Sequence, residues 1–516
     1  MQRKQLTLVI VSLLVVVLSV SLAWFTTQII GKGKNLNVSS ANLQIVFTDS
    51  DGALTETDIE PGWSATKTFT IKNDTKTEYK YNIVIKDLVN TFVTNGYLQY
   101  KITSTNNGYN MTEFKDIPKS SAPKDTILAY SVVIPNGVTQ SYTIEFKYAN
   151  DESVDQSDDM GKKLSGTLFI TEGTEPTLLT QLLADKSTVL TRTDFSTVLT
   201  NDNTNTLYTS TEDSKTVYYF AGNATDNWVK FGKNASNQDL YWRIIRTNSD
   251  GSVRLLYHGT STTATDAVIN TSTAFNTTYN NPMYVGYMYG TSGSLVNNRT
   301  NTNNSTIKGI IDTWYASNLE AKGYTKYLST TAVYCNDRSN PAGGYNTGKT
   351  SFNYGARTRL DTYKTPTYDC TDTNDKFTVD TSTGNGKLTY PIALMTADEV
   401  SFAGGLYANY NANAWYFRNA KEGTLTTSSS STDASYSSTG STYWWLLSPF
   451  YWFGSSARAS VFYVGGSSLP GFLGDYFVDG TRGVRPAVSL KSCVKTSGGD
   501  GSAGTPYTIE ESTSGC

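Results

Sequence analysis

Few residues in this chain have the side chains that catalysis or metal binding usually needs. The 516 residues include one histidine, His258, and four cysteines, Cys335, Cys370, Cys493 and Cys516. A Ser–His or Cys–His pair could use only His258, which ends a strand pattern and has no partner identifiable from sequence, so we interpret it as structural. No two-histidine metal site can form, and no C-x-x-C spacing for zinc is present. We therefore predict no enzyme activity, no metal site and no cofactor.

The residues that could carry function instead lie near the carboxyl end, in 446–490. This segment is mostly Phe, Tyr, Trp, Ser, Gly, Leu, Asp and Arg. Tyr and Trp supply large rigid contact areas, and Ser and Gly adapt between them. Tyr, Trp and Arg are also enriched at interface hot spots. We predict a ligand-binding surface formed by Tyr451, Trp452, Phe453, Arg458, Phe462, Tyr463, Phe472, Asp475 and Tyr476.

The same aromatic residues could instead fill a hydrophobic core. In SVFYVGG, strand alternation puts Phe462 and Val464 on one face and Val461 and Tyr463 on the other. For each residue, core and surface positions both stay open. Close by, Arg482 and Arg485 favour structural ion pairs over contact with an acidic ligand.

Composition excludes some classes of protein. Lys and Arg number 42 against 45 Asp and Glu, a net charge of −3, which argues against a nucleic-acid binder. Charged residues are 17% and aromatic residues 12% of the chain. Few charged helical surfaces are therefore available, and the Ser, Thr, Asn, Gly and Tyr content favours strands and ordered loops.

The amino terminus predicts export. Arg3 and Lys4 precede an apolar run from Leu6 to about Phe25, so residues 1–25 form either a cleaved signal or a membrane anchor. In both cases we expect the remainder to be extracellular, at the cell surface or secreted. An even number of cysteines in an exported chain suggests disulfides, and proximity in sequence favours Cys335–Cys370 and Cys493–Cys516.

Strand patterns dominate the next part of the chain. Seven short alternating segments lie between 43 and 171, separated by turn residues, and they predict an antiparallel β-sandwich over 26–172. The acidic stretch 151–159 is interpreted as a solvated loop rather than a calcium site. Residues 173–215 are predicted as a linker with a short helix over 177–192.

A larger α+β domain is predicted over 216–516. Residues 248–251 form a hairpin turn signal between RIIRT and VRLLYH. The spacing predicts a helix over 306–324 and a shorter one over 396–405, with Thr396 as N-cap. After Cys493 we expect a turn and one more strand. The fold class is therefore mostly β, with an α+β second domain.

Two family resemblances accompany these patterns. The segment SLAWFTT, followed by strands and EPGWSATKTFTIKN, resembles the camelysin-type exported proteins and biofilm-fibre sandwich proteins of Gram-positive bacteria. It covers 1–172 and implies a surface spacer or fibre module. No H-E-x-x-H motif supports a protease.

The second resemblance covers 216–516. The ordered motifs WRIIR, RLLY, TADE, YWWLLSP and GVRPAVSLK resemble the C-type-lectin-like fold in its formylglycine-generating-enzyme form, and an uncharacterised Gram-positive domain family. The resemblance implies a compact mixed fold with a loop-rich ligand face. The paired active-site cysteines of the enzymes have no counterpart between Cys370 and Cys493, and the Glu-Pro-Asn or Gln-Pro-Asp sugar motif of true lectins is missing.

The same fold hosts the variable proteins of diversity-generating retroelements. There, adenines of Asn codons are randomised, and an AAC codon cannot become Lys, Gln, Glu or Met. Residues 446–490 contain no Asn, Lys, Gln, Glu or Met, and only Trp452 departs from the allowed set. The resemblance thus implies a diversified binding face.

Together these observations predict an exported cell-surface binding protein or adhesin. Its partner would be a protein or glycan on another cell, host or phage surface. Two alternatives stay open. One is a structural fibre or pilus-like subunit polymerised through the sandwich. The other is an oxidase or hydrolase of the formylglycine-generating superfamily, which would need an acid, base or metal cluster in a pocket.

Overall fold

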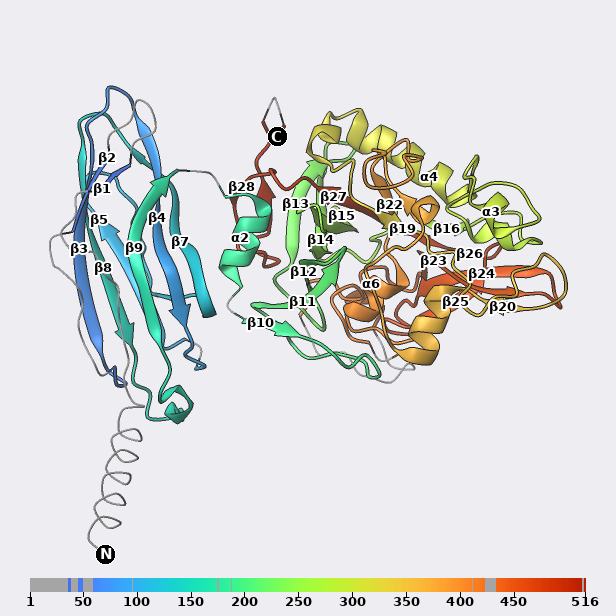
Figure 1. The fold of residues 1–516 in the computed structure, drawn as a ribbon, viewed down its shortest axis with the longest axis horizontal. Coiled ribbons are helices and arrows are strands. Elements are labelled where there is room, and N and C mark those ends of the chain that lie inside the picture. Colours follow the sequence, from blue (N-terminus) through green and yellow to red (C-terminus); the bar gives the residue numbers. More distant parts are fainter. Residues whose placement is uncertain are drawn as a thin grey trace, which may run out of the picture. The chain divides into compact units, whose positions relative to one another are not determined.

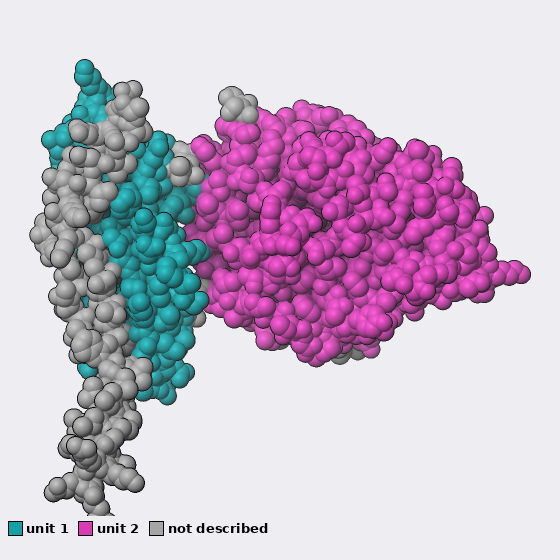
Figure 2. Space-filling model, viewed as in Figure 1, with its two compact units in different colours: residues 1–176 teal, residues 177–516 magenta. Residues whose placement is uncertain are grey.

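The computed structural model describes residues 59–512 and 515–516, with gaps at 95, 174–175, 187, 411 and 423–432, and the backbone of two earlier strands. The chain divides into two compact units, unit 1 (Met1–Pro176) and unit 2 (Thr177–Cys516), coloured separately in Figure 2. The predicted signal or anchor, 1–25, lies outside the described residues. Within the described ranges no helix is long and apolar enough to cross a membrane.

Unit 1 consists of antiparallel strands in two sheets, with strand orders β1-β2-β3-β8-β5-β6 and β7-β4-β9 (Figure 1). These strands are β1 (Leu36–Val38), β2 (Ile45–Asp49), β3 (Ser64–Asn73), β4 (Tyr79–Asn90), β5 (Leu98–Ser104), β6 (Lys115–Asp116), β7 (Ser120–Ile134), β8 (Thr139–Tyr148) and β9 (Leu164–Glu172). A single 3-10 turn among the described residues of this unit, Ser157–Asp159, precedes β9.

The core of unit 1 follows from strand alternation. In β8, every second residue is buried, including Tyr142, Ile144 and Phe146. Ile144 belongs to the same hydrophobic cluster as Ile83 of β4 and Ile170 of β9, so the two sheets share one core. Each of the seven predicted strand segments is a strand here, which confirms the β-rich character expected from sequence.

The acidic stretch 151–159 is only partly solvated. Asp159 is 2% exposed. Its carboxylate accepts hydrogen bonds from the Val93 N–H at 2.5 Å and the Tyr148 hydroxyl at 2.9 Å. The solvated-loop prediction is therefore wrong for Asp159, because this side chain ties the loop to the neighbouring strands.

Unit 2 contains two larger sheets and two short ladders (Figure 1). The ten-stranded sheet comprises β10 (Thr188–Thr191), β11 (Thr206–Glu212), β12 (Lys215–Tyr219), β13 (Trp228–Lys233), β14 (Asp239–Thr247), β15 (Val253–Gly259), β22 (Ile392–Leu394), β27 (Pro486–Leu490), β28 (Thr496–Gly498) and β29 (Tyr507–Ile509). The six-stranded sheet comprises β16 (Asn270–Ala274), β20 (Phe352–Asn353), β23 (Trp444–Phe453), β24 (Arg458–Val464), β25 (Leu473–Phe477) and β26 (Thr481–Val484). The ladders pair β17 (Met288–Tyr289) with β18 (Asn303–Asn304), and β19 (Tyr334–Cys335) with β21 (Lys376–Phe377).

The α-helices of unit 2 are short. They are α2 (Leu178–Asp185), α3 (Leu295–Asn298), α4 (Thr306–Tyr315), α5 (Gly355–Arg357) and α6 (Ala397–Phe402). The predicted helix 306–324 begins as α4, continues as a π-helical turn over Ala316–Glu320, and ends before Gly323, whose φ is +76°. The predicted capping box of α6 is present: the Thr396 side chain accepts from the Glu399 N–H, and Glu399 accepts from the Thr396 N–H.

The predicted linker, 173–215, belongs to unit 2 from Thr177 onward. Leu178 and Leu182 of α2 are 1% exposed and pack into the main core of unit 2. Strands β10 and β11 pair in parallel and extend the ten-stranded sheet. This segment is therefore an integral part of unit 2 and not a linker, because its apolar helix face is covered by that core.

Candidate functional site

The predicted binding residues lie on the six-stranded sheet of unit 2, where β23, β24 and β25 are neighbours (Figure 1). Residues paired across antiparallel strands point to the same face. Tyr451 pairs with Ser460, and Phe453 with Arg458. Asp475 pairs with Phe462, and Tyr476 with Val461. Alternation therefore puts Tyr451, Phe453, Arg458, Phe462 and Asp475 on one face, and Trp452, Tyr463 and Tyr476 on the other. The nine predicted residues do not form one surface.

Three of the nine are core residues. Trp452 and Phe462 are fully buried, and Tyr463 is 7% exposed. The Trp452 indole N–H donates to the Gly348 carbonyl at 3.0 Å, so the polar atom of this buried side chain has a hydrogen-bond partner. A surface position is therefore wrong for these three, because both faces of the sheet are partly covered by other segments. Tyr476 is exposed, and Tyr451, Phe453, Arg458, Phe472 and Asp475 are half-buried.

A connected series of rings follows the first face. Neighbouring ring centroids are 4.5 to 6.4 Å apart, within the range of favourable aromatic pairing. We call this series the aromatic row, and it consists of Tyr407, Phe450, Tyr451, Phe453 and Phe477. Phe450 anchors the row to the core, because it is 2% exposed and packs edge-on against the buried Phe462.

Two arginines lie on the aromatic row. The Arg357 guanidinium is 4.5 Å from the Phe450 ring centroid and 4.3 Å from that of Tyr451. The Arg458 guanidinium is 4.0 Å from the Phe477 centroid, and its Nη2 pairs with Asp479 at 2.5 Å. Arg357 has only a 3.7 Å ion pair with Asp361 and makes no hydrogen bond to a described residue. Its Nε is buried without a hydrogen-bond partner, and the side chain is 25% exposed.

A carboxylate sits beside the row. Asp475 accepts a hydrogen bond from the Tyr407 hydroxyl at 3.2 Å. Burial raises the pKa of Asp475, although hydrogen bonds from Ser460 and Tyr407 and the charge of Arg357 act in the opposite direction. The first face therefore combines rings, one half-buried guanidinium and one partly buried carboxylate, which are groups that can contact a ligand.

The second face carries a different arrangement. The Arg482 guanidinium is 5.3 Å from the Tyr443 centroid, 4.9 Å from that of Tyr463 and 3.7 Å from that of Tyr476. Phe472 extends this group, with its ring 5.9 Å from Tyr463. Neither Arg482 nor Arg485 forms an ion pair with a described residue. The predicted salt bridges are therefore wrong, because aromatic rings and carbonyl oxygens surround the two guanidinium groups.

Sequence reasoning missed three of the five residues of the aromatic row, and it missed Arg357. Phe450 and Phe477 lie inside the segment that was singled out, and their position beside predicted residues was a usable signal. Arg357 belongs to the short helix α5 and Tyr407 to an irregular segment, and both are distant in sequence from the predicted residues. Nothing in their local sequence indicates that they meet β23 and β24.

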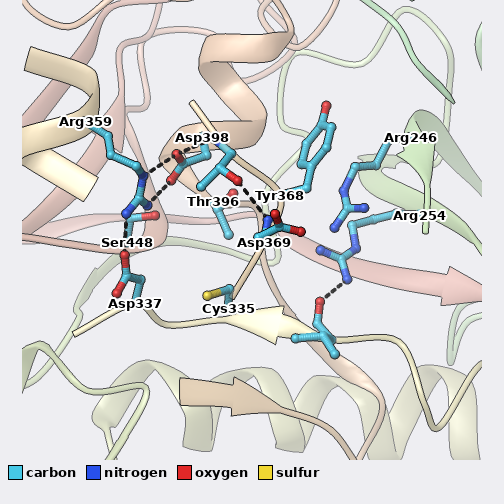
Figure 3. A pocket seen from close by; sticks show the side chains of 12 residues that line it. Arg246, Arg254, Cys335, Asp337, Arg359, Tyr368, Asp369, Thr396, Asp398 and Ser448 are labelled. Atoms are coloured by element: carbon cyan, nitrogen blue, oxygen red, sulfur yellow. Dashed lines mark hydrogen bonds and ion pairs between the residues drawn. The ribbon is translucent and has the colours of Figure 1, made fainter. Parts of the chain in front are cut away.

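A second polar region surrounds the disulfide Cys335–Cys370 (Figure 3). Figure 3 shows Arg359 between two carboxylates, with Asp337 at 2.5 Å and Asp398 at 2.9 Å. The cavity here is about 20 Å³, room for one water molecule. We interpret it as a structural ion-pair cluster, because it has no space for a substrate.

Glu399 continues this cluster toward the ten-stranded sheet. Its Oε1 accepts from Arg246 at 2.9 Å and from Arg254 at 2.7 Å. Burial alone would raise the pKa of Glu399, but Arg254 and Arg246 outweigh burial and hold it below the ordinary value. Glu212 also pairs with Arg246, at 2.8 Å, so two buried carboxylates balance two buried arginines.

The remaining chemistry-bearing residues are also structural. Both predicted disulfides, Cys335–Cys370 and Cys493–Cys516, are present. His258 is fully buried, and burial, followed by the charges of Arg485 and Arg243, keeps its pKa well below the usual range. Over the residues the structure describes, no group of three or more His, Cys, Asp or Glu side chains could hold a metal ion.

Comparisons with known proteins give little further information. A family described as a domain of unknown function (DUF6273) matches residues 363–492, which include β23 to β26. No curated protein sequence matches the chain. A solved structure titled "AvmM Catalyzes Macrocyclization in Alchivemycin A Biosynthesis" is 10% identical and covers 28% of this chain and 100% of its own, with a TM-score of 0.16. A score this low carries no argument about fold or activity.

Proposed function

We propose that this chain is an exported, cell-surface binding protein that recognises a macromolecular ligand through the aromatic row of unit 2. Unit 2 would be a C-type-lectin-like α+β domain. Unit 1 would be a β-sandwich spacer that holds it away from the membrane segment 1–25. The partner is a protein or glycan on another cell, host or phage surface.

One observation carries this proposal: a series of five neighbouring rings along one sheet face, four of them half-buried and anchored by the buried Phe450, with the Arg357 guanidinium packed on them. Rigid aromatic side chains lose little entropy on binding, and arginine can donate several hydrogen bonds at once. Asp475 adds an acceptor beside them. Such a surface fits a polar partner with an apolar patch.

The burial pattern also supports diversification of 446–490. Trp452, the residue that a randomised AAC codon cannot produce, is fully buried and belongs to the framework. The half-buried positions of the row, Tyr451 and Phe453, carry residues that such a codon allows. A neighbouring near-copy of these codons that differs at adenines is the expected genomic signature.

The proposal is tested by binding of the labelled, purified chain to intact bacterial and animal cells, measured by flow cytometry. We expect the double variant Tyr451→Ala/Phe453→Ala to weaken binding about tenfold or more, as expected for interface hot spots. Tyr476→Ala, on the opposite face, should bind like the natural chain.

Pretreating the cells separates the two partner classes. Loss of binding after protease treatment indicates a protein, and loss after periodate oxidation indicates a glycan. Equal binding by the double variant and the natural chain, with unchanged circular dichroism, would exclude the aromatic row as the contact surface.

A further inference from the structure

A second cavity in unit 2 lies away from the aromatic row. Its volume is about 300 Å³, at the lower end of the range for small-molecule sites. It is lined by side chains from four segments of unit 2, among them Trp228, Arg243, Arg418, Lys421 and Glu422. Amide and hydroxyl residues such as Asn223 and Ser502 complete the wall. The cavity is therefore larger than an inorganic ion needs, and its wall combines polar and apolar surface.

One of the residues that line this cavity, Arg243, is a buried cation. Arg243 is 2% exposed, and its guanidinium lies 4.0 Å from the Trp228 ring centroid. Three of its five N–H groups donate to neutral oxygens: Nε to Asn227 Oδ1 at 2.6 Å, Nη1 to the Arg418 carbonyl at 3.1 Å, and Nη2 to the Ala224 carbonyl at 2.8 Å. No carboxylate of the described residues pairs with it.

A second buried arginine, Arg485, acts electrostatically on Arg243. Arg485 is fully buried and donates to the carbonyls of Tyr257 and Tyr416, and to His258 Nδ1 at 3.2 Å. Burial lowers the pKa of Arg485 to about 9, and burial followed by the charge of Arg485 lowers the pKa of Arg243. His258 supplies no negative charge.

One nearby carboxylate, Asp226, acts on this pair: its charge raises the pKa of Arg243, against the larger lowering by burial. Asp226 is engaged by Lys186 at 2.6 Å. Asp433 is 3.9 Å from Lys421, and both of these side chains are about half exposed. In the cavity wall itself the carboxylate is Glu422, and Asp202, outside the wall, acts on Arg418. The buried cations Arg243, Arg485 and Lys186 thus share one buried carboxylate, Asp226. Buried cations that outnumber their counter-charges are costly, so a bound anion would stabilise this arrangement.

We propose that this cavity binds a small organic anion of the acidic-sugar class. Its carboxylate contacts Arg243, with Arg418 and Lys421 at the rim, and the sugar body fills the remaining volume, with its hydroxyl groups on the amide and hydroxyl side chains and its ring carbons on the apolar part of the wall. This site uses different elements from the aromatic row and does not depend on the function proposed for that row.

The test uses the full chain and D-glucuronate as the probe, with D-glucose as the neutral control. Ligand that binds only the folded state raises the melting temperature. We expect glucuronate, and not glucose, to raise it, and calorimetry to give a saturable isotherm. Lys421→Ala should lower the affinity for glucuronate about three- to tenfold, and Glu422→Gln should raise that affinity by a similar factor. Both residues are exposed, so both variants should fold.

Several results would overturn the proposal. An equal response in the natural chain and both variants would indicate a general salt effect. Sulfate or phosphate binding in place of glucuronate would exclude a sugar-sized ligand. A response of Lys387→Ala, an exposed lysine remote in sequence, equal to that of Lys421→Ala would show that the cavity is not involved.

Discussion

Unit 1 and unit 2 differ in what fills their interiors. Unit 1 buries mainly apolar side chains from alternating strands, and residues 1–176 contain no cysteine and one arginine, Arg3. In unit 2, Arg243, Arg254, Arg338 and Arg485 are each at most 2% exposed. The comparison indicates that regular strands fold mainly on apolar burial with few buried charges, whereas long loops need buried guanidinium groups to fix their paths.

The loops of unit 2 illustrate this need. Arg338 donates to Asp375 at 2.7 Å and to the Met288 carbonyl at 2.9 Å, so one side chain joins three distant segments. In unit 1 the corresponding connections are backbone ladders, such as the nine paired positions between β3 and β8. Changes to charges and disulfides should therefore affect unit 2 and leave unit 1 intact.

The largest expected effect comes from Glu399→Gln. The substitution leaves Arg254 buried without a carboxylate partner and Arg246 with Glu212 alone, so the free energy of unfolding of unit 2 should fall by about 3–5 kcal/mol. Urea unfolding followed by tryptophan fluorescence reports on unit 2, because only Trp24 and Trp63 of the nine tryptophans precede it. Hydrogen exchange in β8 should stay unchanged.

This prediction has a pH signature and a control. Because the folded-state pKa of Glu399 is lowered, its stabilising contribution is present above the ordinary glutamate pKa and is lost as the pH falls through the lowered value. The difference in free energy of unfolding between the natural chain and the variant should therefore disappear on acidification. Glu113→Gln, an exposed change in unit 1, should leave both units unaffected. Equal destabilisation of both units by Glu399→Gln would contradict the comparison.

A smaller effect is expected when one disulfide is removed. Cys493 and Cys516 are 23 residues apart, and opening a loop of this size costs about 3 kcal/mol in the chain-entropy estimate. The double variant Cys493→Ser/Cys516→Ser should lower the urea midpoint of unit 2. Dithiothreitol should likewise lower the urea midpoint of unit 2 in the natural chain, while hydrogen exchange in β8 stays constant. A matching loss in unit 1 would show that the two units do not unfold separately.

The smallest effect concerns Asp475. Because burial raises its folded-state pKa, folding disfavours the ionised form, and stability falls as the pH rises above the ordinary aspartate pKa. Asp475→Asn should therefore stabilise unit 2 slightly at pH 7 and make no difference at pH 3. Denaturation midpoints at the two pH values measure this. Destabilisation at pH 7 would mean that Asp475 serves the fold and not a ligand.

Sequence reasoning succeeded where local rules decide the structure. The strands of unit 1, the turn at 248–251 and the cap at Thr396 each depend on residues a few positions apart. Both disulfides join cysteines that are neighbours among the four. The predicted alternation of Phe462 and Tyr463 is also correct, since a strand imposes it whatever covers its faces.

The candidate site was less predictable, because exposure depends on what covers each face. Trp452 and Tyr451 are adjacent in sequence, yet one is buried beneath other segments and the other contacts Arg357 on the opposite side. No local pattern distinguishes them.

The sequence alone determined a β-rich chain, the strands of unit 1 and the cysteine pairs, because propensity, alternation and turn chemistry act over short separations. Only the tertiary structure decided which rings are accessible and which arginines lack a counter-charge. Arg485 meets His258 across 227 positions, and Arg243 meets the Arg418 carbonyl across 175. Contacts at such separations arise from how the sheets and loops pack, and the residue types do not encode them individually.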